Sequence, residues 1–216
     1  MEMKKSSRIA IGIMFFLFLV GCAGPVVRDA TKVDMSLPVG QMQGNQFVGI
    51  RYPFKLTVPP GWQASSEYPN FMLQLGFDKE GLEDSQVFVF NPETQSNLQI
   101  DFSPAGRHAK FDQKNIEWLT TTAEGSFKEE FEKEFGKGGR FTLSTTQPYS
   151  LKGVPYAAKN FGTYSRRGVK TEHGWIYAFA EPYQIFIIYM VLEKEGKNDH
   201  QDMKAIIDSF EYSGKK

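Results

Sequence analysis

Cys22 is the only cysteine among the 216 residues of the chain, and its type and position suit it to covalent chemistry. A thiol becomes a nucleophile or a metal ligand when it loses its proton. Cys22 stands directly after an uncharged apolar run, residues 9–20. Because there is no second cysteine, a disulfide within the chain is excluded. The position favours covalent attachment at Cys22 over a structural role.

The segment before Cys22 has the layout of a secretory signal peptide. Lys4, Lys5 and Arg8 form a basic start, and 12 apolar residues follow them. As a helix this run would be about 18 Å long, at about 1.5 Å per residue, whereas a bilayer core is about 30 Å thick. The run is too short to span comfortably, which favours a signal peptide. The alternative is a buried helix of a cytosolic protein, and the absence of any polar face argues against it.

The four residues Leu19, Val20, Gly21 and Cys22 resemble the bacterial lipobox. The resemblance implies a diacylglyceryl group on the Cys22 sulfur, with Leu19, Val20 and Gly21 recognised by the signal peptidase and the cut made before Cys22. Two or more acyl chains give stable anchoring. Ala23 follows, which resembles the outer-membrane address of enteric lipoproteins. We therefore expect a lipoprotein of the bacterial cell envelope, held in the outer membrane through the lipid on Cys22 and facing the periplasm.

Three histidines are the other residues that could bind a metal or move a proton: His108, His173 and His200. No two of them have the spacing of a helical metal-ligand pair such as His-x-x-x-His. We interpret each as an exposed structural histidine. A metal site that joins two of them across the fold is the alternative. The sequence predicts no metal and no cofactor.

Two charged segments have ordinary structural explanations. The acidic stretch from Asp78 to Asp84 lacks the alternation and the final glutamate of a calcium loop, and it reads as a solvated turn. Arg166, Arg167 and Lys170 are predicted at a hairpin tip, with contact to lipid headgroups or an acidic partner as the alternative.

No Gly-x-Ser-x-Gly motif occurs in the chain. We predict no catalytic residues and no enzymatic activity.

The charge of the mature chain argues against nucleic acid as a partner. Removal of residues 1–21 takes away three basic residues and Glu2, which leaves 22 basic and 24 acidic residues. The net charge is then about −2, with no basic stripe.

Of the 31 aromatic residues, most lie on predicted core faces. A surplus of them lining an apolar pocket is the alternative to core packing.

The chain is expected to have three parts: a signal peptide at 1–21, a lipidated tether at 22–45 and a globular domain at 46–216. Residues 22–45 mix glycine, proline and scattered charges without periodicity. Alternation of apolar residues predicts strands near 54–58 and 97–102, and 71–77 and 86–90 are further strand candidates. Length suggests one folded domain.

A change of period predicts a long helix, capped by Asp112 at its start and ended by Gly136. Four strands and a short helix at 199–210 are predicted after it. Ile185 to Leu192 are eight apolar residues in a row, which suits a strand covered on both faces. The predicted fold class is α+β, an antiparallel sheet with helices on both faces in three layers.

The order of elements resembles the PsbP-like fold, which Ran-binding Mog proteins and bacterial DcrB-like lipoproteins share. The likeness covers roughly residues 46–212 and includes the strand that ends in Pro59, Pro60, Gly61 and Trp62, the central helix, and the closing helix before "IIDSFEY". The resemblance implies an accessory, docking or assembly protein. No site of the family maps onto this chain residue by residue.

The resulting hypothesis is a lipid-anchored, non-enzymatic accessory protein that binds a protein partner or supports an envelope complex. One alternative is a carrier or sensor for a small apolar or lipid ligand. A second is a hydrolytic enzyme whose site is assembled from distant strands.

Overall fold

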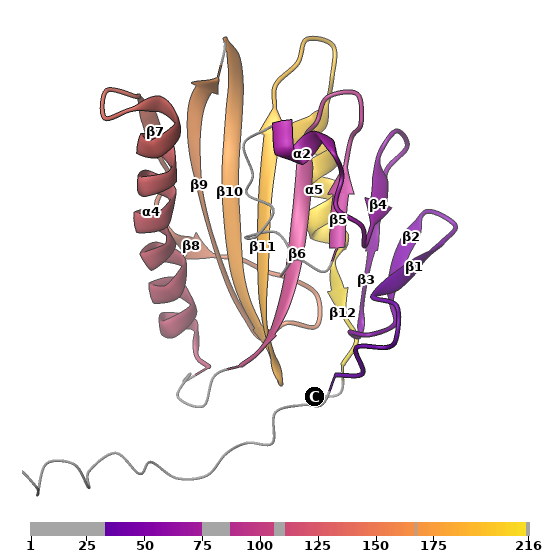
Figure 1. The fold of residues 1–216 in the computed structure, drawn as a ribbon. Helices are drawn as coiled ribbons and strands as arrows, with labels where there is room; N and C mark the ends of the chain where they lie inside the picture. The colour runs from indigo at the N-terminus through magenta and orange to yellow at the C-terminus, as the bar shows by residue number, and fades with distance from the viewer. Residues whose placement is uncertain (1–32, 75–86, 106–110, 167, 215–216) are drawn as a thin grey trace, which may run out of the picture. The chain divides into compact units, whose positions relative to one another are not determined.

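Two antiparallel sheets and two helices of more than ten residues form most of the described part of the chain (Figure 1). The computed structural model describes residues 33–74, 87–105, 111–166 and 168–214. The chain divides into two units, Met1–Ala30 and Thr31–Lys216, and every described residue belongs to the second.

The larger sheet has eight strands, in the order β4-β5-β6-β11-β10-β9-β7, with β8 paired to β9. All of its pairings are antiparallel. Its strands are β4 (Gln63–Ser65), β5 (Val87–Phe90), β6 (Asn97–Pro104), β7 (Phe141–Leu143), β8 (Gln147–Pro148), β9 (Tyr156–Arg166), β10 (Val169–Ala180) and β11 (Tyr183–Leu192). The strands β9, β10 and β11 are the longest and form the frame on which both helices pack.

The smaller sheet has four strands in the order β1-β2-β3-β12: β1 (Gly40–Gln43), β2 (Gln46–Gly49), β3 (Phe54–Thr57) and β12 (Glu211–Tyr212). Strand β1 lies inside the range expected to be a tether, so folded structure begins before residue 46. A two-residue turn, Gly44-Asn45, joins β1 to β2, and Gly44 has a φ of 64°, which favours glycine. Val39, the residue before β1, is also buried.

Helix α4 (Gln113–Phe135) and helix α5 (Asp199–Ser209) cover opposite faces of the larger sheet. Along β10, Trp175 packs with Phe127 and other aromatic residues of the α4 layer. Its neighbour Ile176 points the other way, into the core shared with Met203 of α5 and with the smaller sheet. This alternation confirms the predicted α+β class with helices on both faces, although the strands form two sheets and not one.

The ends of α4 are as predicted. The backbone N–H of Asn115 donates to Oδ1 of Asp112 at 2.8 Å, which satisfies a helix N–H that has no partner within the helix. Gly136 ends the helix with a φ of 76°, and its N–H donates to the Glu132 carbonyl at 2.9 Å. Inside the layer, the Trp175 indole donates to the Thr120 carbonyl at 2.8 Å and fixes the helix on the sheet.

The strand predicted at 71–77 is wrong for its first four residues. They form a single helical turn, α2 (Phe71–Gln74), and residues 75–77 lie outside the described part. The Met72 N–H donates to the Pro69 carbonyl at 3.0 Å, and Met72 packs against Phe88. A short apolar run has no period that separates helix from strand, so its neighbours decide its conformation.

Tyr189 of β11 lies over Gly174 of β10, its direct partner in the strand register. A Cβ atom on Gly174 would overlap the Cζ and hydroxyl atoms of the Tyr189 ring. Tyr189 is 2% exposed, so its ring cannot move aside into solvent. Glycine at position 174 is therefore a packing requirement of this face of the sheet.

The variant Gly174→Ala should lower the free energy of unfolding by about 1–3 kcal/mol, the usual cost of overpacking a core. The matched control is Gly125→Ala, because Gly125 lies within α4 with open space around its Cα. That change should raise the free energy of unfolding by about 0.5–1 kcal/mol through helix propensity. Urea unfolding measures the free energy of unfolding of both variants. Equal effects of the two substitutions would contradict the close approach of Tyr189.

His173 is buried on the α4 face, which contradicts its interpretation as an exposed histidine. It is 9% exposed, and its ring meets Phe127 edge-on with centroids 5.5 Å apart. Burial removes the charged imidazolium from water and lowers the pKa of His173 to about 4. It shares the sheet face of Trp175, as residues two apart on a strand do.

His173 should make stability fall in mild acid. The unfolded chain binds a proton near pH 6.5, whereas the folded chain binds it only near pH 4, so stability is lost as the pH falls through this window. From about pH 7.5 to about pH 5 the loss is about 2 kcal/mol. Urea unfolding should show that His173→Met removes this part of the pH dependence. Parallel pH curves for the two proteins would show that His173 does not titrate as inferred.

Candidate functional site

Several residues singled out in the sequence lie outside the described part of the chain. These are the lipobox residues Leu19, Val20, Gly21 and Cys22, the histidine His108, and the acidic stretch from Asp78 to Asp84. Their predicted roles stay predictions. Within the described residues, no helix is both long and apolar enough to cross a membrane. The same residues contain no group of three or more His, Cys, Asp or Glu side chains arranged to hold a metal ion.

The two described histidines lie on opposite faces of the larger sheet. His173 packs with Phe127 on the α4 face, and His200 lies in the first turn of α5. A metal site that joins them is therefore excluded by the sheet between them. His200 is partly exposed, with 43% of its side chain accessible, and it takes part in a polar network.

A groove of about 300 Å³ lies between α5 and the strands β9, β10 and β11. Three apolar side chains, Val191, Met203 and Ile207, form part of its lining. Six side chains with polar groups complete it: Tyr149, Lys159, Glu172, Tyr189, His200 and Lys204. The three apolar residues are only 1–2% exposed, so the surface that a ligand would meet comes mainly from polar and charged side chains of the sheet and the helix.

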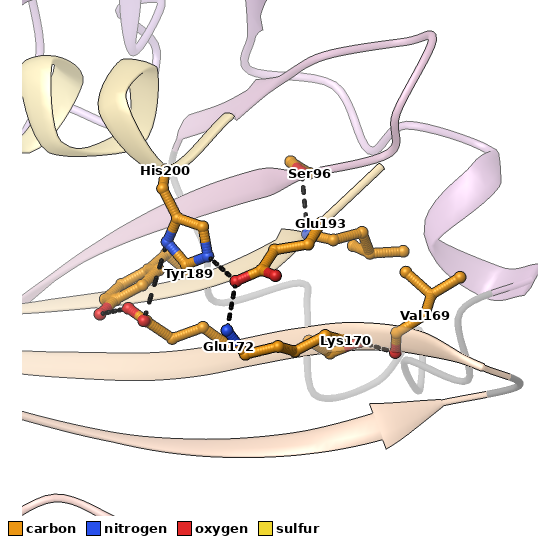
Figure 2. A network of polar contacts seen from close by, with 9 residues as sticks. Ser96, Val169, Lys170, Glu172, Tyr189, Glu193 and His200 are labelled. Carbon is orange, nitrogen blue, oxygen red and sulfur yellow. Dashed lines mark hydrogen bonds and ion pairs between the residues drawn. The ribbon is translucent and has the colours of Figure 1, made fainter. Parts of the chain in front are cut away.

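Glu172 is a fixed acceptor between Tyr189 and His200 (Figure 2). The Tyr189 hydroxyl donates to Oε1 of Glu172 at 2.7 Å, and Nδ1 of His200 lies 3.8 Å from Oε2. Burial, followed by the neighbouring Glu172 carboxylate, raises the pKa of Tyr189, so its hydroxyl stays protonated as a donor. The Glu172 side chain is 18% exposed. Both of its oxygens thus face groups of the protein.

Glu193 forms the outer end of the same network (Figure 2). Its Oε1 lies 2.8 Å from Nζ of Lys170 and 2.9 Å from Nε2 of His200. The hydrogen bond from Lys170 is the main cause that lowers the pKa of Glu193, and Glu193 in turn raises the pKa of Lys170. Lys170 was predicted at a charged hairpin tip that could contact headgroups. It follows the β9–β10 turn as predicted, and its ammonium is engaged by Glu193.

Lys159 projects from β9 into the groove, where three aromatic rings surround its ammonium. Its Nζ lies 5.5 Å from the ring centroid of Tyr149, 5.7 Å from that of Phe161 and 5.0 Å from that of Tyr189. Burial lowers the pKa of Lys159, and the carboxylates of Glu172 and Asp208 offset part of this effect. An ammonium over aromatic faces is stabilised by their quadrupoles, although these faces accept no strong hydrogen bond.

The second carboxylate near Lys159 is that of Asp208, and other donors also engage it. The Tyr149 hydroxyl donates to its Oδ1 at 2.8 Å, and the Lys204 ammonium pairs with its Oδ2. Burial would raise the pKa of Asp208, but the hydrogen bonds from Lys204 and Tyr149 outweigh it and lower the pKa. Within the described part of the chain, no carboxylate forms an ion pair with Lys159.

The groove is equipped to bind a polar ligand. Among the described residues that line it, none is a serine, threonine or cysteine, so the usual hydroxyl and thiol nucleophiles are not among them. Glu172, His200 and Lys204 are held by hydrogen bonds or ion pairs, and Lys159 by three aromatic rings, before any ligand arrives. Groups fixed in advance lower the ordering cost of binding.

Two inward charges were the sequence signal for this groove. Lys159 shares a strand face with Ala157, and Glu172 shares one with Ile176, both of which are buried. A charged residue on the apolar face of a long strand needs a partner or a solvent-filled recess. The spacing of the histidines carries no signal for either position.

A second hollow, of about 460 Å³, lies beyond His200 along residues 191–201. Asp199 lies in its wall and is 3% exposed. The Asn91 side-chain amide donates to Oδ1 of Asp199 at 3.4 Å, which ties the start of α5 to the turn after β5. We assign this contact a structural role.

No model of a known protein family matches the chain, and no curated protein matches it either. Among solved structures, it is similar to CyanoP, the PsbP of the cyanobacterium Synechocystis, with 11% identity and a TM-score of 0.46 over 82% of this chain and 99% of that one. LpqN of Mycobacterium tuberculosis, described as involved in cell envelope biogenesis, has 14% identity and a TM-score of 0.48 over 73% and 82%. The yeast Ran-binding protein Mog1p has 11% identity and a TM-score of 0.41 over 74% and 90%.

These similarities are of the kind that the sequence resemblance implied. With identities of 14% or less and TM-scores below 0.5, they carry no argument about function. The fold class rests on the sheets and helices themselves. Membership among DcrB-like lipoproteins stays a prediction.

The network predicts different costs for two hydroxyl deletions. Tyr189→Phe removes a buried donor to the Glu172 carboxylate and should lower the free energy of unfolding by about 1.5–3 kcal/mol. Tyr149→Phe removes an exposed hydrogen bond to Asp208 and should cost no more than about 1 kcal/mol. Thermal and urea unfolding of the two variants measure the difference. If Tyr149→Phe costs as much as Tyr189→Phe, the hydrogen bond from Tyr189 to Glu172 does not have the stabilising role inferred from it.

Proposed function

We propose that this chain is a lipid-anchored accessory protein of a bacterial cell envelope, which acts by binding a protein partner and not by catalysis. The observation that carries the binding part is the groove beside α5, where charged side chains are fixed in position above buried apolar residues. A site of this kind can recognise a ligand without further ordering.

The anchoring part is supported by the sequence before the described domain. Leu19, Val20 and Gly21 precede the single cysteine, at the end of an apolar run too short for a comfortable span. Acylation of Cys22 would hold the domain at a membrane, and Ala23 favours the outer membrane. The domain would then face the periplasm.

The two alternatives predict different sites. A carrier for an apolar or lipid ligand calls for a largely apolar pocket, whereas two lysines, a glutamate and a histidine line the groove. A hydrolase calls for a nucleophile or an activated water beside a base. Glu172 and His200 do meet in the groove, but the Tyr189 hydroxyl and the side chains around them engage both in the resting fold. These contacts favour binding.

The anchor and the partner are tested together on the full chain in a bacterial host. Mass spectrometry of the membrane fraction should find a chain that begins at Cys22 and carries added acyl mass. After cross-linking and detergent extraction, a partner protein should co-purify. The control Cys22→Ala cannot accept the lipid, so we expect it to lose the acyl mass and to leave the membrane fraction.

The two parts of the proposal fail separately. An unmodified chain with an intact N-terminus in the membrane fraction would exclude the lipid anchor. An acylated chain that never cross-links to another protein would exclude the partner-binding role while leaving the anchor in place.

A further inference from the structure

Exposed apolar side chains are concentrated in one short segment of the described chain. Five large apolar side chains of that part are at least 40% exposed, and one of them is Trp118 on α4, at 65%. The other four lie between residues 35 and 50: Met35 at 64%, Leu37 at 41%, Met42 at 43% and Ile50 at 40%. Single exposed apolar residues are common on protein surfaces, whereas a concentration of them marks an interaction site.

Met35, Leu37 and Ile50 are held together at the base of the first hairpin, and we call these three residues the hairpin-base surface. The Ile50 N–H donates to the Val39 carbonyl at 2.9 Å, which joins the end of β2 to the segment before β1. The guanidinium of Arg51 donates to the Met35 carbonyl at 3.1 Å and to the Leu37 carbonyl at 2.6 Å. Figure 1 shows this hairpin at the outer edge of the smaller sheet.

The backbone of the hairpin-base surface is already satisfied by internal hydrogen bonds. A carbonyl or N–H that leaves water for an apolar medium costs free energy unless it has a partner within the protein. The carbonyls of Met35 and Leu37 accept from Arg51, and the Leu37 N–H donates to the Asp34 carbonyl at 3.2 Å. These groups can therefore leave water at a reduced cost.

Charge is absent from the same stretch of sequence. Residues 35–50 contain no charged side chain, in a chain with 25 basic and 25 acidic residues among 216. The two charged residues that flank the stretch, Asp34 and Arg51, have opposite signs. The stretch therefore has no charge that must be removed from water when its apolar side chains are buried.

The hairpin-base surface does not belong to either hollow described above. None of its three residues lines the groove beside α5 or the hollow along residues 191–201. They lie in a turn region and at a strand end, where apolar side chains protrude from the backbone. A lipid surface accepts protruding apolar side chains without a matching shape, whereas a folded protein partner must be complementary to them.

The place of this surface in the chain selects lipid as its occupant. Cys22, the proposed site of lipid attachment, is 13 residues before Met35, whereas Trp118 is 96 residues after Cys22. A chain spans at most about 3.6 Å per residue, so Cys22 and Met35 are no more than about 47 Å apart. A second contact with the surface that holds the anchor is intramolecular, which makes a weak contact effective.

We propose that Met35, Leu37 and Ile50 insert into the lipid bilayer that holds the acyl chains of Cys22, as a second and non-covalent contact. This inference rests on the lipid anchor of the proposed function, but it does not depend on the partner that the groove binds. The contact fixes which side of the domain faces the lipid.

The test is photo-cross-linking in the membranes of a bacterial host that produces the full chain. The photoreactive residue p-benzoylphenylalanine replaces Leu37 in one protein, Ile50 in a second and Trp118 in a control. All three side chains are exposed, so the core is left intact. Mass spectrometry should find lipid adducts at positions 37 and 50 in at least about ten-fold excess over position 118, the factor that burial of one large apolar side chain supplies.

A second measurement asks whether these side chains hold the hairpin at the lipid. With the photoreactive residue in place of Met42 on β1, Leu37→Ser/Ile50→Ser should give at least about ten-fold fewer lipid adducts than the parent protein. Trp118→Ser is the matched control, because it removes a larger and more exposed apolar side chain from α4. It should leave the yield unchanged. Circular dichroism checks the fold of each variant.

The remaining outcomes overturn the proposal. Adducts with another protein at positions 37 and 50, in place of lipid, would assign the surface to a protein partner. Adducts between two copies of the chain would assign it to self-association. Equal lipid adducts at positions 37, 50 and 118, no adducts at all, or a yield at position 42 that Leu37→Ser/Ile50→Ser does not change would show that these side chains make no specific lipid contact.

The mass of the N-terminus in the same samples separates this inference from the anchor on which it rests. A chain acylated at Cys22 without lipid adducts at positions 37 and 50 removes the hairpin-base contact alone. A chain with an intact N-terminus that still gives these adducts removes the anchor alone. An intact N-terminus without adducts removes both.

Discussion

The contact of the Tyr189 ring with Gly174 organises the face of the sheet that carries the groove. The two residues are direct partners in the β10–β11 register, and the missing side chain at position 174 gives the ring its place. From there the Tyr189 hydroxyl reaches Glu172, and the ring face lies 5.0 Å from the Lys159 ammonium. One close approach of ring and backbone thus positions an acid and a base of the groove. It also explains how two charged residues are tolerated on an otherwise apolar face. Glu172 accepts a hydrogen bond from Tyr189, and the Lys159 ammonium lies over the Tyr189 ring.

Much of the architecture could be predicted because the signals are local. The strand at residues 97–102, the Asp112 cap and the glycine after α4 depend on residues near them in sequence, and the structure confirms them. Two further local signals in the sequence indicate features that were not predicted. The Gly44-Asn45 turn marks the first hairpin, inside the supposed tether, and the alternation from His173 to Phe179 places His173 on a buried face.

The groove could not be predicted in the same way, because register between strands and a helix builds it. Lys159 lies on β9, Glu172 on β10 and His200 on α5, and no spacing along the chain links them. The signal in the sequence was a lysine and a glutamate at positions on apolar strand faces. Such a pair of charges indicates a polar recess, but it does not indicate which other residues line it. The same limit explains why histidine spacing does not reveal the role of His200, whose contacts are Glu172 and Glu193.

The α4 face of the sheet is occupied by packing, whereas the α5 face combines packing with the groove. On the α4 face, aromatic packing and the hydrogen bond from Trp175 to Thr120 are buried, and His173 is kept neutral there by its surroundings. On the α5 face, the charged groups border solvent, and hydrogen bonds, ion pairs or aromatic rings hold them in place. A group exposed in a recess can exchange water for a ligand, whereas one sealed behind a helix cannot. Changes on the α4 face should therefore act on folding, whereas changes among the charged groups beside α5 should also act on binding.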